Sequence, residues 1–269
     1  MTYITLRNHG RPPLPRRRLD ETPSLFVVSL PRSLSSTIYS SARGALGLNR
    51  PPHASAGEIL NYLRTRLPVR SLPPKAMFTT REHDPVSFER HIAFLDRTVK
   101  SEGFAYKDVV NPFVVADWPG LLRLKVLKIR RDLAEVAFAI LAKGWTYPGN
   151  GAQEQHGAEW SIVEGLVRAE MVLAALPGPT IEFEDAITDH TALEETLRTL
   201  YPGVPRMPLT YIDDGFIRER QRRRKAMAES PRLREVRNLV EAVRAHLGSR
   251  SRGGDEIPRW DEAAALRRG

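Results

Sequence analysis

The sequence predicts an α/β fold in which a parallel β-sheet is flanked by helices. Short apolar segments alternate along the chain with longer segments whose apolar residues recur at helical spacing. The first short segment, residues 25–30 (LFVVSL), is almost wholly apolar, which is typical of a strand covered on both faces of a sheet. No repeat of fixed period stands out, so we expect one α/β domain.

Apolar periodicity, prolines and capping residues set the expected order of strands and helices. Strands are predicted at 25–30, 77–80, 104–110, 124–129 and 180–183. Helices are predicted from the loop after residue 30 to about 44–47, from Ser55, from Asp84 to Gly103, and over 112–118, 134–143, 160–176 and 191–200. A basic loop and a terminal helix are expected after Pro205.

Composition indicates a globular protein without disulfides. The chain has 269 residues, of which 41% are hydrophobic and 27% charged, and it contains no cysteine. It shows no apolar run of bilayer length and no signal-peptide hydrophobic region, so we expect a cytoplasmic protein. We expect an irregular basic arm at 1–22, the α/β domain at 23–248 and a flexible tail at 249–269.

A net charge of +9 and a pI near 10.1 favour anionic partners. The excess is concentrated in residues 11–18 and 217–225. Such runs suit nucleic acid, an anionic membrane surface or a polyanionic small molecule, or they form a solvated tail and a solvated helix face. No recognition motif accompanies them and aromatic residues make up only 7% of the chain, so nucleic acid ranks last.

Residues 31–37 (PRSLSST) lie where the strand 25–30 is expected to pass into a helix, and we name them the anion loop. A helix N-terminus offers backbone N–H groups and the positive end of a dipole to an anion. Arg32 adds a cation, and hydroxyl donors come from Ser33, Ser35, Ser36 and Thr37. The segment indicates a phosphate or sulfate site, and an ordinary connection capped by serine is the alternative.

The anion loop lacks the Walker A pattern. It resembles the 5′-phosphosulfate loop of sulfotransferases, commonly P-[RK]-S-G-[ST]-[ST] after a strand. The matching residues are Pro31, Arg32, Ser33, Ser35 and Ser36. Leu34 stands where the family has glycine, so the loop keeps its form if Leu34 fits at negative φ, and the donor site is altered if it does not.

Residues 126–140 (VLKIRRDLAEVAFAI) resemble the second sulfotransferase fingerprint, [VL]-R-D-P-x-D-V-x-x-S. Arg131, Asp132 and Glu135 match it, whereas Leu133 replaces the proline and Ala139 the serine. The resemblance implies that Arg131 holds the 3′-phosphate of the donor, 3′-phosphoadenosine 5′-phosphosulfate (PAPS). The alternative is a strand-to-helix turn with surface arginines.

Two further segments resemble the same family in the same order. Residues 183–186 (FEDA) stand at its Y-E-D-L segment, which is mainly a structural signature. Residues 104–110 (FAYKDVV) resemble a strand that ends in K-[TD]-x, with Lys107 at the lysine and Val109 where one branch has a catalytic histidine. Lys107 is therefore either a second cation near the sulfuryl group or a solvated strand-end lysine.

A hydroxyl acceptor needs a general base, and Glu58 is our choice. Family branches without the histidine have a glutamate after the first helix, where Gly57-Glu58 lies here. The alternative is that Glu58 completes a capping box with Ser55. His83 and His91 are rival bases, and no set of His, Asp and Glu has metal-ligand spacing, so we expect no metal.

The arginine run at 217–225 lies where the family often has a basic loop that contacts the 3′-phosphate. Arg224 and Lys225 are the candidate nucleotide ligands, although Ala226 replaces the glycine of the usual R-K-G. The remaining cations of the run form a solvated face or receive an acidic acceptor.

The four segments together indicate a PAPS-dependent sulfotransferase of the P-loop-type α/β fold. The acceptor would be a hydroxyl, or less often an amine, of a small molecule or carbohydrate. Leu34, Leu133 and Ala139 leave open a second interpretation, a nucleotide-binding module that has lost catalysis. The third, a nucleic-acid-binding protein, uses the two arginine runs.

Overall fold

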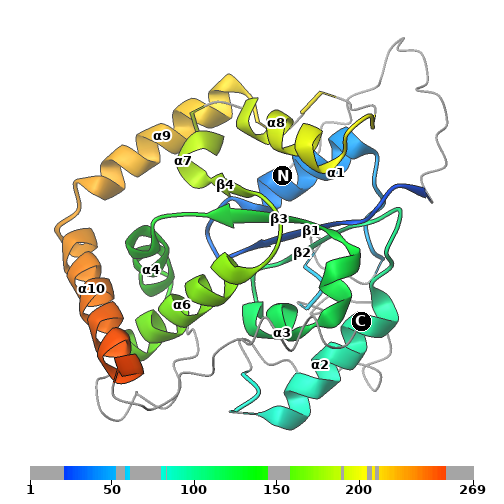
Figure 1. Cartoon of the computed structure of the whole chain (residues 1–269). Helices are drawn as coiled ribbons and strands as arrows, with labels where there is room; N and C mark the ends of the chain where they lie inside the picture. The colour runs from blue at the N-terminus through cyan, green and yellow to red at the C-terminus, as the bar shows by residue number, and fades with distance from the viewer. Residues whose placement is uncertain are drawn as a thin grey trace.

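The computed structural model describes residues 21–52, 58–60, 80–82, 84–144, 158–188, 191–204, 208–209 and 212–252 (Figure 1). The elements are β1 (Leu25–Ser29), α1 (Ser35–Leu46), α2 (Pro85–Thr98), β2 (Ala105–Asp108), α3 (Pro112–Asp117), the 3-10 helix η3 (Pro119–Arg123), β3 (Lys125–Arg130), α4 (Leu133–Leu141), α6 (Ala158–Ala175), β4 (Thr180–Glu182), α7 (Phe183–Ala186), α8 (Thr191–Leu200), α9 (Asp214–Ala228) and α10 (Pro231–Arg252). Nearly all of the predicted arm at 1–22 and most of the predicted tail at 249–269 lie outside the described residues.

The described strands form one parallel sheet of four, in the order β2-β1-β3-β4. β1 lies between β2 and β3, with Val28 opposite both Asp108 and Lys128. All five residues of β1 are buried, as its apolar sequence predicts. The predicted fold class, a parallel sheet flanked by helices, is confirmed.

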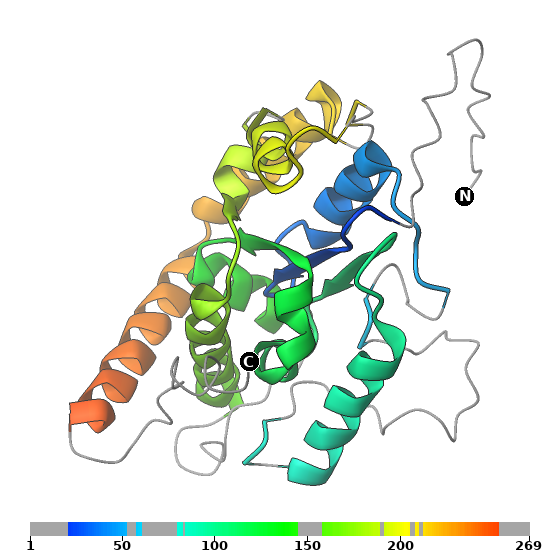
Figure 2. The ribbon, with the colours of Figure 1, turned by 45° about the vertical axis from the view of Figure 1, so that its right-hand side comes forward.

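Helices cover both faces of the sheet because successive side chains of a strand point to opposite faces. Phe26 and Val28 pack in one hydrophobic cluster with residues of α2, α3, α4, α6 and α10. Leu25 and Val27 pack in the other cluster, with residues of α1 and α8. Figures 1 and 2 show α1 and α8 on one side of the sheet and α3, α4 and α6 on the other.

Three helices begin at an aspartate that caps them. Asp84, Asp132 and Asp213 each accept a hydrogen bond from a backbone N–H of the first turn, in α2, α4 and α9 respectively. Pro85 follows Asp84 at the first helical position, as the sequence predicts. None of the helices in the described ranges combines the length and the apolarity needed to cross a bilayer.

Three predicted elements differ from the structure. Helix α2 ends at Thr98 and not at Gly103, and Glu102 instead forms an antiparallel bridge with Pro23. Glu58 does not stand in the first turn of a helix from Ser55, because it forms a parallel β-bridge with Lys107. The Ile59 N–H donates to the Lys107 carbonyl, and this bond lets Ile59 and Leu60 both bury their side chains against the core.

The basic run after Pro205 is not a loop. Residues Asp214–Ala228 form helix α9, which begins at the Asp213 cap, and α10 follows after Ser230. Most of the predicted strand 77–80 lies outside the described residues.

Helix α9 crosses from one side of the sheet to the other (Figure 1). Near its start, Ile217 is buried in the cluster that includes α1 and α8. Near its end, Met227 packs against the cluster that includes α4, α6 and α10. The helix therefore passes over the carboxyl ends of the strands.

Candidate functional site

The carboxyl ends of β1 and β3 bound a crevice, and Lys107 and Glu58 lie beside it, at the carboxyl end of β2. α1 follows β1 on one face of the sheet, and α4 follows β3 on the other. Neighbouring parallel strands whose following helices lie on opposite faces leave an opening at their carboxyl ends, and ligands of α/β folds bind there. The anion loop borders this crevice from β1, and Arg131 borders it from β3.

The anion loop contains two residues in the left-handed conformation. Arg32 has a φ of 66° and Leu34 a φ of 63° with a ψ of 11°. Leu34 therefore does not adopt negative φ, the condition under which we expected an unaltered donor site. It instead takes the conformation that glycine favours, at a cost of about 1–2 kcal/mol. The Leu34 side chain packs against the hydrophobic cluster that includes α1 and α8, and this contact offsets part of the cost.

The N-terminus of α1 receives no side-chain cap. Leu34 is its N-cap residue, and no side chain accepts from the first-turn amides. Ser33 and Ser35 are buried, and the Ser33 Oγ finds no hydrogen-bond partner within the described residues. Arg32 and Ser36 are exposed, and Thr37 is half-buried. These are the donors expected of a site for an oxyanion.

Lys107 joins three predicted site residues into one cluster. Its Nζ lies 3.0 Å from the Glu58 Oε1 and donates to the Ser36 Oγ at 2.8 Å. Lys107 is fully buried, whereas 17% of the Glu58 side chain is exposed. The alternative of a solvated strand-end lysine is wrong, and so is the capping-box role of Glu58, because its backbone extends the edge of the sheet.

Asp108 is a buried carboxyl next to this cluster that was not predicted as a site residue. Its Oδ2 accepts from the N–H groups of Val110 (3.1 Å) and Asn111 (2.8 Å), and its Oδ1 has no partner within the described ranges. Burial, with a smaller contribution from Glu58, raises the pKa of Asp108 to about 7. A carboxylate at the end of an otherwise apolar strand is the sequence signal that would have found it.

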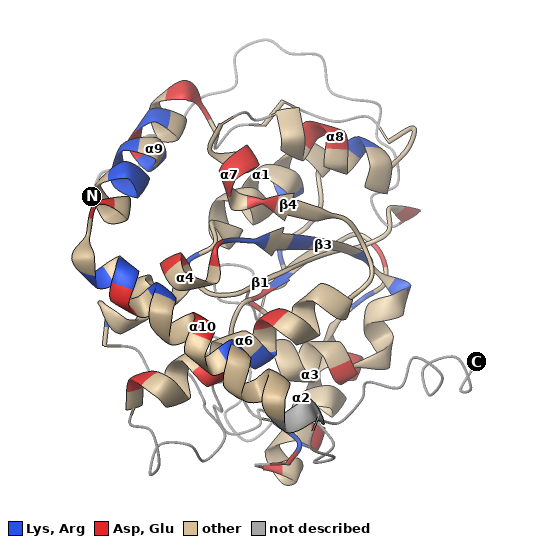
Figure 3. Cartoon of the chain, turned by 60° about the vertical axis from the view of Figure 1, so that its left-hand side comes forward, with Lys and Arg blue, Asp and Glu red and all other residues tan. Residues whose placement is uncertain are grey.

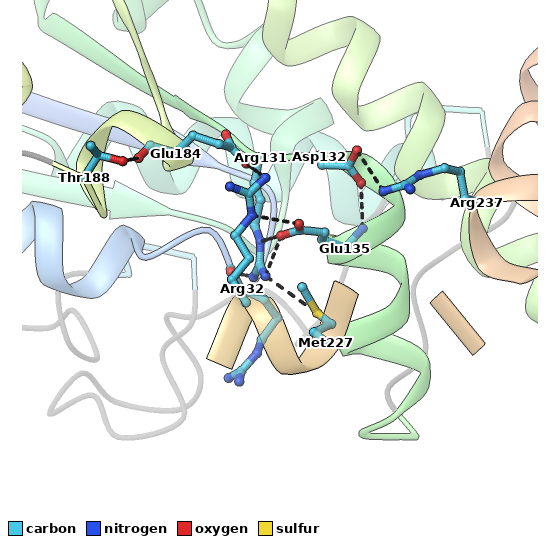
Figure 4. Close-up of polar contacts among 9 residues, drawn as sticks. Arg32, Arg131, Asp132, Glu135, Glu184, Thr188, Met227 and Arg237 are labelled. Carbon is cyan, nitrogen blue, oxygen red and sulfur yellow. Dashed lines mark hydrogen bonds and ion pairs between the residues drawn. The ribbon is translucent and has the colours of Figure 1, made fainter. Parts of the chain in front are cut away.

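Arg131 spans the crevice and donates to the protein itself (Figure 4). Its Nη1 donates to the Arg32 carbonyl at 2.6 Å, and its Nε donates to the Glu135 Oε2 at 3.0 Å. Its guanidinium also lies 4.2 Å from the centre of the Phe183 ring. Burial lowers the pKa of Arg131, and Glu135 acts in the opposite direction.

Arg224 belongs to the same network, and Lys225 does not. The Arg224 Nε donates to the Glu135 Oε1 at 3.0 Å, and its Nη2 lies 2.9 Å from the Glu184 Oε1. Two arginines and two glutamates thus neutralise one another at the carboxyl ends of β3 and β4. Lys225 is exposed on α9.

Arg220 is a member of the basic run that the sequence did not single out. Burial lowers its pKa, and Arg223, Arg32 and Arg131 lower it further by repulsion, so its guanidinium lies within electrostatic reach of the anion loop. Its spacing of three from Ile217 and four from Arg224 is the signal that would have found it, since all three share one face of a helix.

The histidine alternatives do not gain support. His91 is fully buried in α2, with its Nδ1 2.6 Å from the Ser87 carbonyl oxygen, and burial lowers its pKa. It cannot reach an acceptor, so it is excluded as the base. His83 lies outside the described residues. No group of three or more potential metal ligands occurs in the part of the chain that the structure describes.

Two cavities adjoin Arg130 and Arg131 on the side of the crevice nearer β4. One, of about 420 Å³, is also lined by Arg224, Glu184 and residues of α10. The other, of about 410 Å³, is lined mainly by β3 and the end of α6. Neither is lined by Glu58, by Lys107 or by a residue of the anion loop.

Comparisons with known proteins do not assign the chain to a family. No protein-family model matches the chain, and no curated protein matches it. A crystal structure of a sulfotransferase from Alicyclobacillus acidocaldarius is 14% identical over 82% of this chain and 98% of that chain, with a TM-score of 0.35. A TM-score of this size assigns neither fold nor function.

Proposed function

We propose that the chain is a sulfotransferase that moves a sulfuryl group from PAPS to a hydroxyl, or less often an amine, of a small molecule or carbohydrate. The contact of Lys107 with both Glu58 and Ser36 is the observation that carries this proposal. It joins a candidate base, a candidate cation and the anion loop within hydrogen-bond distance of one another.

The anion loop fits the phosphosulfate end of the donor. The first-turn amides of α1 have no side-chain cap, and the Ser33 hydroxyl is buried without a partner among the described residues. Together with the Arg32 guanidinium and the α1 dipole, these donors suit a bound oxyanion. No metal is needed for this role, because the amides and guanidinium can hold the charge.

The reaction would be an in-line displacement at sulfur. The acceptor oxygen forms a bond to sulfur as the bond between sulfur and the 5′-phosphate oxygen breaks, and 3′-phosphoadenosine 5′-phosphate leaves. Glu58 takes the acceptor proton. Lys107 and Arg32 face the charge that spreads over the peripheral and leaving oxygens, and such preorganised electrostatics supply most of the catalysis in transfers of this kind.

The 3′-phosphate of the nucleotide would share guanidiniums that the protein already uses. Arg131 and Arg224 both pair with Glu135, and Arg224 also pairs with Glu184. We propose that the 3′-phosphate meets the outward edges of these arginines. Lys225, being exposed, contributes less than Arg224.

A nucleotide-binding module without catalysis is the second candidate. The pairing of Arg131 and Arg224 with carboxylates favours it, because these arginines serve the fold already. Such a module would bind 3′-phosphoadenosine 5′-phosphate and transfer nothing to any acceptor in a panel of alcohols, phenols, amines and sugars.

Two substitutions test the proposed reaction. Arg32→Ala should abolish transfer and weaken binding of 3′-phosphoadenosine 5′-phosphate, measured by calorimetry. Glu58→Gln should lower kcat roughly 100-fold while that affinity stays within about threefold, because the base touches the acceptor rather than the nucleotide. Arg130→Ala is the matched control, since Arg130 is an exposed cation at the same edge that pairs with Glu182. Unchanged turnover in Arg32→Ala would refute the loop assignment.

A further inference from the structure

Helix α9 turns a defined face toward the carboxyl ends of the strands. Ile217 is buried, the Gln221 side chain donates to the Ile187 carbonyl at 3.0 Å, and Arg224 pairs with Glu135 and Glu184. Positions separated by three, four and seven residues share one face of a helix. Arg220 lies between these contacts on the same face.

The Arg220 side chain differs from the other arginines of α9 whose contacts are defined. Arg222 and Arg223 pair with Glu219, and Arg224 pairs with two glutamates. Within the described residues Arg220 makes no hydrogen bond and no ion pair, and its guanidinium lies 5.0 Å from the centre of the Phe216 ring. Figure 3 shows how densely the cations of α9 follow one another.

The half-buried Arg220 lies within electrostatic reach of two other cations. Arg32 and Arg131 belong to the anion loop and to the end of β3, and they are joined by the hydrogen bond from Arg131 to the Arg32 carbonyl. Repulsion from both is felt at Arg220. Arg220 also lies one helical turn before Arg224, and the contacts of Arg224 lead through Glu135 and Arg131 to the Arg32 carbonyl of the anion loop. In that loop the α1 end has no side-chain cap and the Ser33 hydroxyl is buried.

We propose that Arg220 is a ligand of the oxyanion bound at the anion loop, so that a bound phosphate or sulfate group clamps α9 onto the sheet. The inference rests on the proposed function only in placing a phosphosulfate group at that loop. Without the anion, repulsion among Arg220, Arg32 and Arg131 opposes the docking of α9. With the anion, the attraction of each guanidinium to the shared negative charge offsets these repulsions.

This arrangement couples two events by linkage. If an anion strengthens the docking of α9, then docked α9 strengthens anion binding by the same factor. The Arg224 network and the burial of Ile217 anchor α9 in both states, so the clamp tightens a helix that is already folded.

The first experiment compares Arg220→Gln with Arg222→Gln in the full chain. The probes are inorganic sulfate and 3′-phosphoadenosine 5′-phosphate, each titrated by calorimetry. Arg220→Gln should weaken both affinities roughly tenfold or more, as expected for loss of a hydrogen bond to a charged group. Arg222→Gln should change them less than twofold, because Arg222 is 79% exposed and pairs with Glu219. Equal effects of the two substitutions would overturn the proposal.

The second experiment follows α9 itself. Trypsin cleaves after Arg and Lys, so the rate of cleavage within α9 measures how often this helix opens. The helix offers six cleavage positions, Arg218, Arg220, Arg222, Arg223, Arg224 and Lys225. Saturating sulfate should slow cleavage of the wild-type helix at least fivefold and should have little effect in Arg220→Gln. Thermal unfolding gives a second signature, because Arg220→Gln should raise the Tm without anion and reduce the gain in Tm with anion. Equal protection in both proteins would overturn the proposal.

The outcomes separate this inference from the proposed function. Sulfate binding that depends on Arg220, in a chain that transfers no sulfuryl group, would support the clamp and refute the enzyme. Sulfuryl transfer and sulfate affinity that are both independent of Arg220 would support the enzyme and refute the clamp.

Discussion

The N-termini of α1 and α4 have similar positions in the fold but differ in how their backbone N–H groups and nearby arginines are paired. Both helices follow a strand of the sheet, and both begin at the same crevice. At α4, Asp132 caps the first turn and Glu135 pairs with two arginines. At α1, Leu34 caps nothing with its side chain, and Ser33 keeps a buried hydroxyl without a partner among the described residues.

This difference shows that similar sequence patterns serve different ends here. Both segments resemble phosphate-binding fingerprints, and both contain an arginine at the turn. The α4 end contains its own anions, so its arginines stabilise the fold in the absence of ligand. The α1 end has donors and cations without built-in carboxylates in its first turn, so it suits an anion from outside.

The largest expected effect lies in the α4 network. Glu135→Ala removes the carboxylate that Arg131 and Arg224 share, and loss of one partner of a buried pair leaves the other charge uncompensated. We expect a loss of about 3 kcal/mol in the free energy of unfolding, measured by urea denaturation. Glu182→Ala, which breaks the more exposed pair with Arg130, should cost under about 1 kcal/mol. Similar losses in the two variants would show that Glu135 does not neutralise Arg131 and Arg224 at the N-terminus of α4.

The buried Asp108, at the end of β2, makes the stability of the fold depend on pH. Its native pKa of about 7 lies above the unfolded value of about 4, so its neutral form is favoured in the folded protein. The stabilisation is complete below the unfolded pKa and is lost as the pH rises through about 7. Asp108→Asn keeps an acceptor for Val110 and Asn111 and removes the charge.

The excess stability of Asp108→Asn over the wild type should therefore grow by a few kcal/mol between pH 4 and pH 7, and then level off. Denaturation curves of both proteins at several pH values measure this difference. A difference that stays constant with pH would contradict the assigned environment of Asp108.

Leu34 tests the conformation of the anion loop. Leu34→Ile conserves volume but places a β-branched residue at a φ of 63°, where such residues are rare. We expect a loss of about 1–2 kcal/mol in stability together with weaker sulfate binding. Leu34→Gly removes both the strain and the apolar contact, so its stability should stay closer to the wild type, and its sulfate binding should persist.

The smallest expected effect compares the two helix caps directly. Asp132→Ala should cost about 1 kcal/mol of stability, since it removes a capping hydrogen bond from α4. Ser33→Ala has no capping bond to remove, so stability should change little while sulfate affinity falls. If instead Ser33→Ala lowers stability and Asp132→Ala lowers sulfate affinity, then the N-terminus of α4 and not that of α1 binds the anion.

Local sequence signals predicted most of the fold. The apolar β1, the Asp84-Pro85 start of α2 and the order of strands and helices were all readable, because each depends on neighbouring residues. Glu58 was misassigned to a helix because its bridge to Lys107 is a contact between distant parts of the chain. The same reasoning applies to the basic run, whose helix is set by the Asp213 cap and by Ile217 packing against the core.

The candidate site was predicted in its parts and not in its connections. Arg32, Lys107 and Glu58 were each named, yet the ion pair and the hydrogen bond that join Lys107 to its neighbours needed the folded chain. The internal pairing of Arg131 with Glu135 was present in the sequence as an i, i+4 pair. Arg220 was missed because its helical spacing from Ile217 and Arg224 becomes informative only once α9 is known to be a helix that buries Ile217.

The central position of β1 also governs when the fold can form. β1 comes first among the described strands, and its partners follow much later, with Leu25 opposite Ala105 and Lys125. Pairing must therefore close long loops, which slows formation of the sheet. During synthesis the buried segment Leu25–Ser29 emerges long before either partner strand exists. A nascent chain that ends before β2 presents an unpaired apolar strand, so chaperone capture at β1 is expected in ribosome-bound fragments and should end once β3 has emerged.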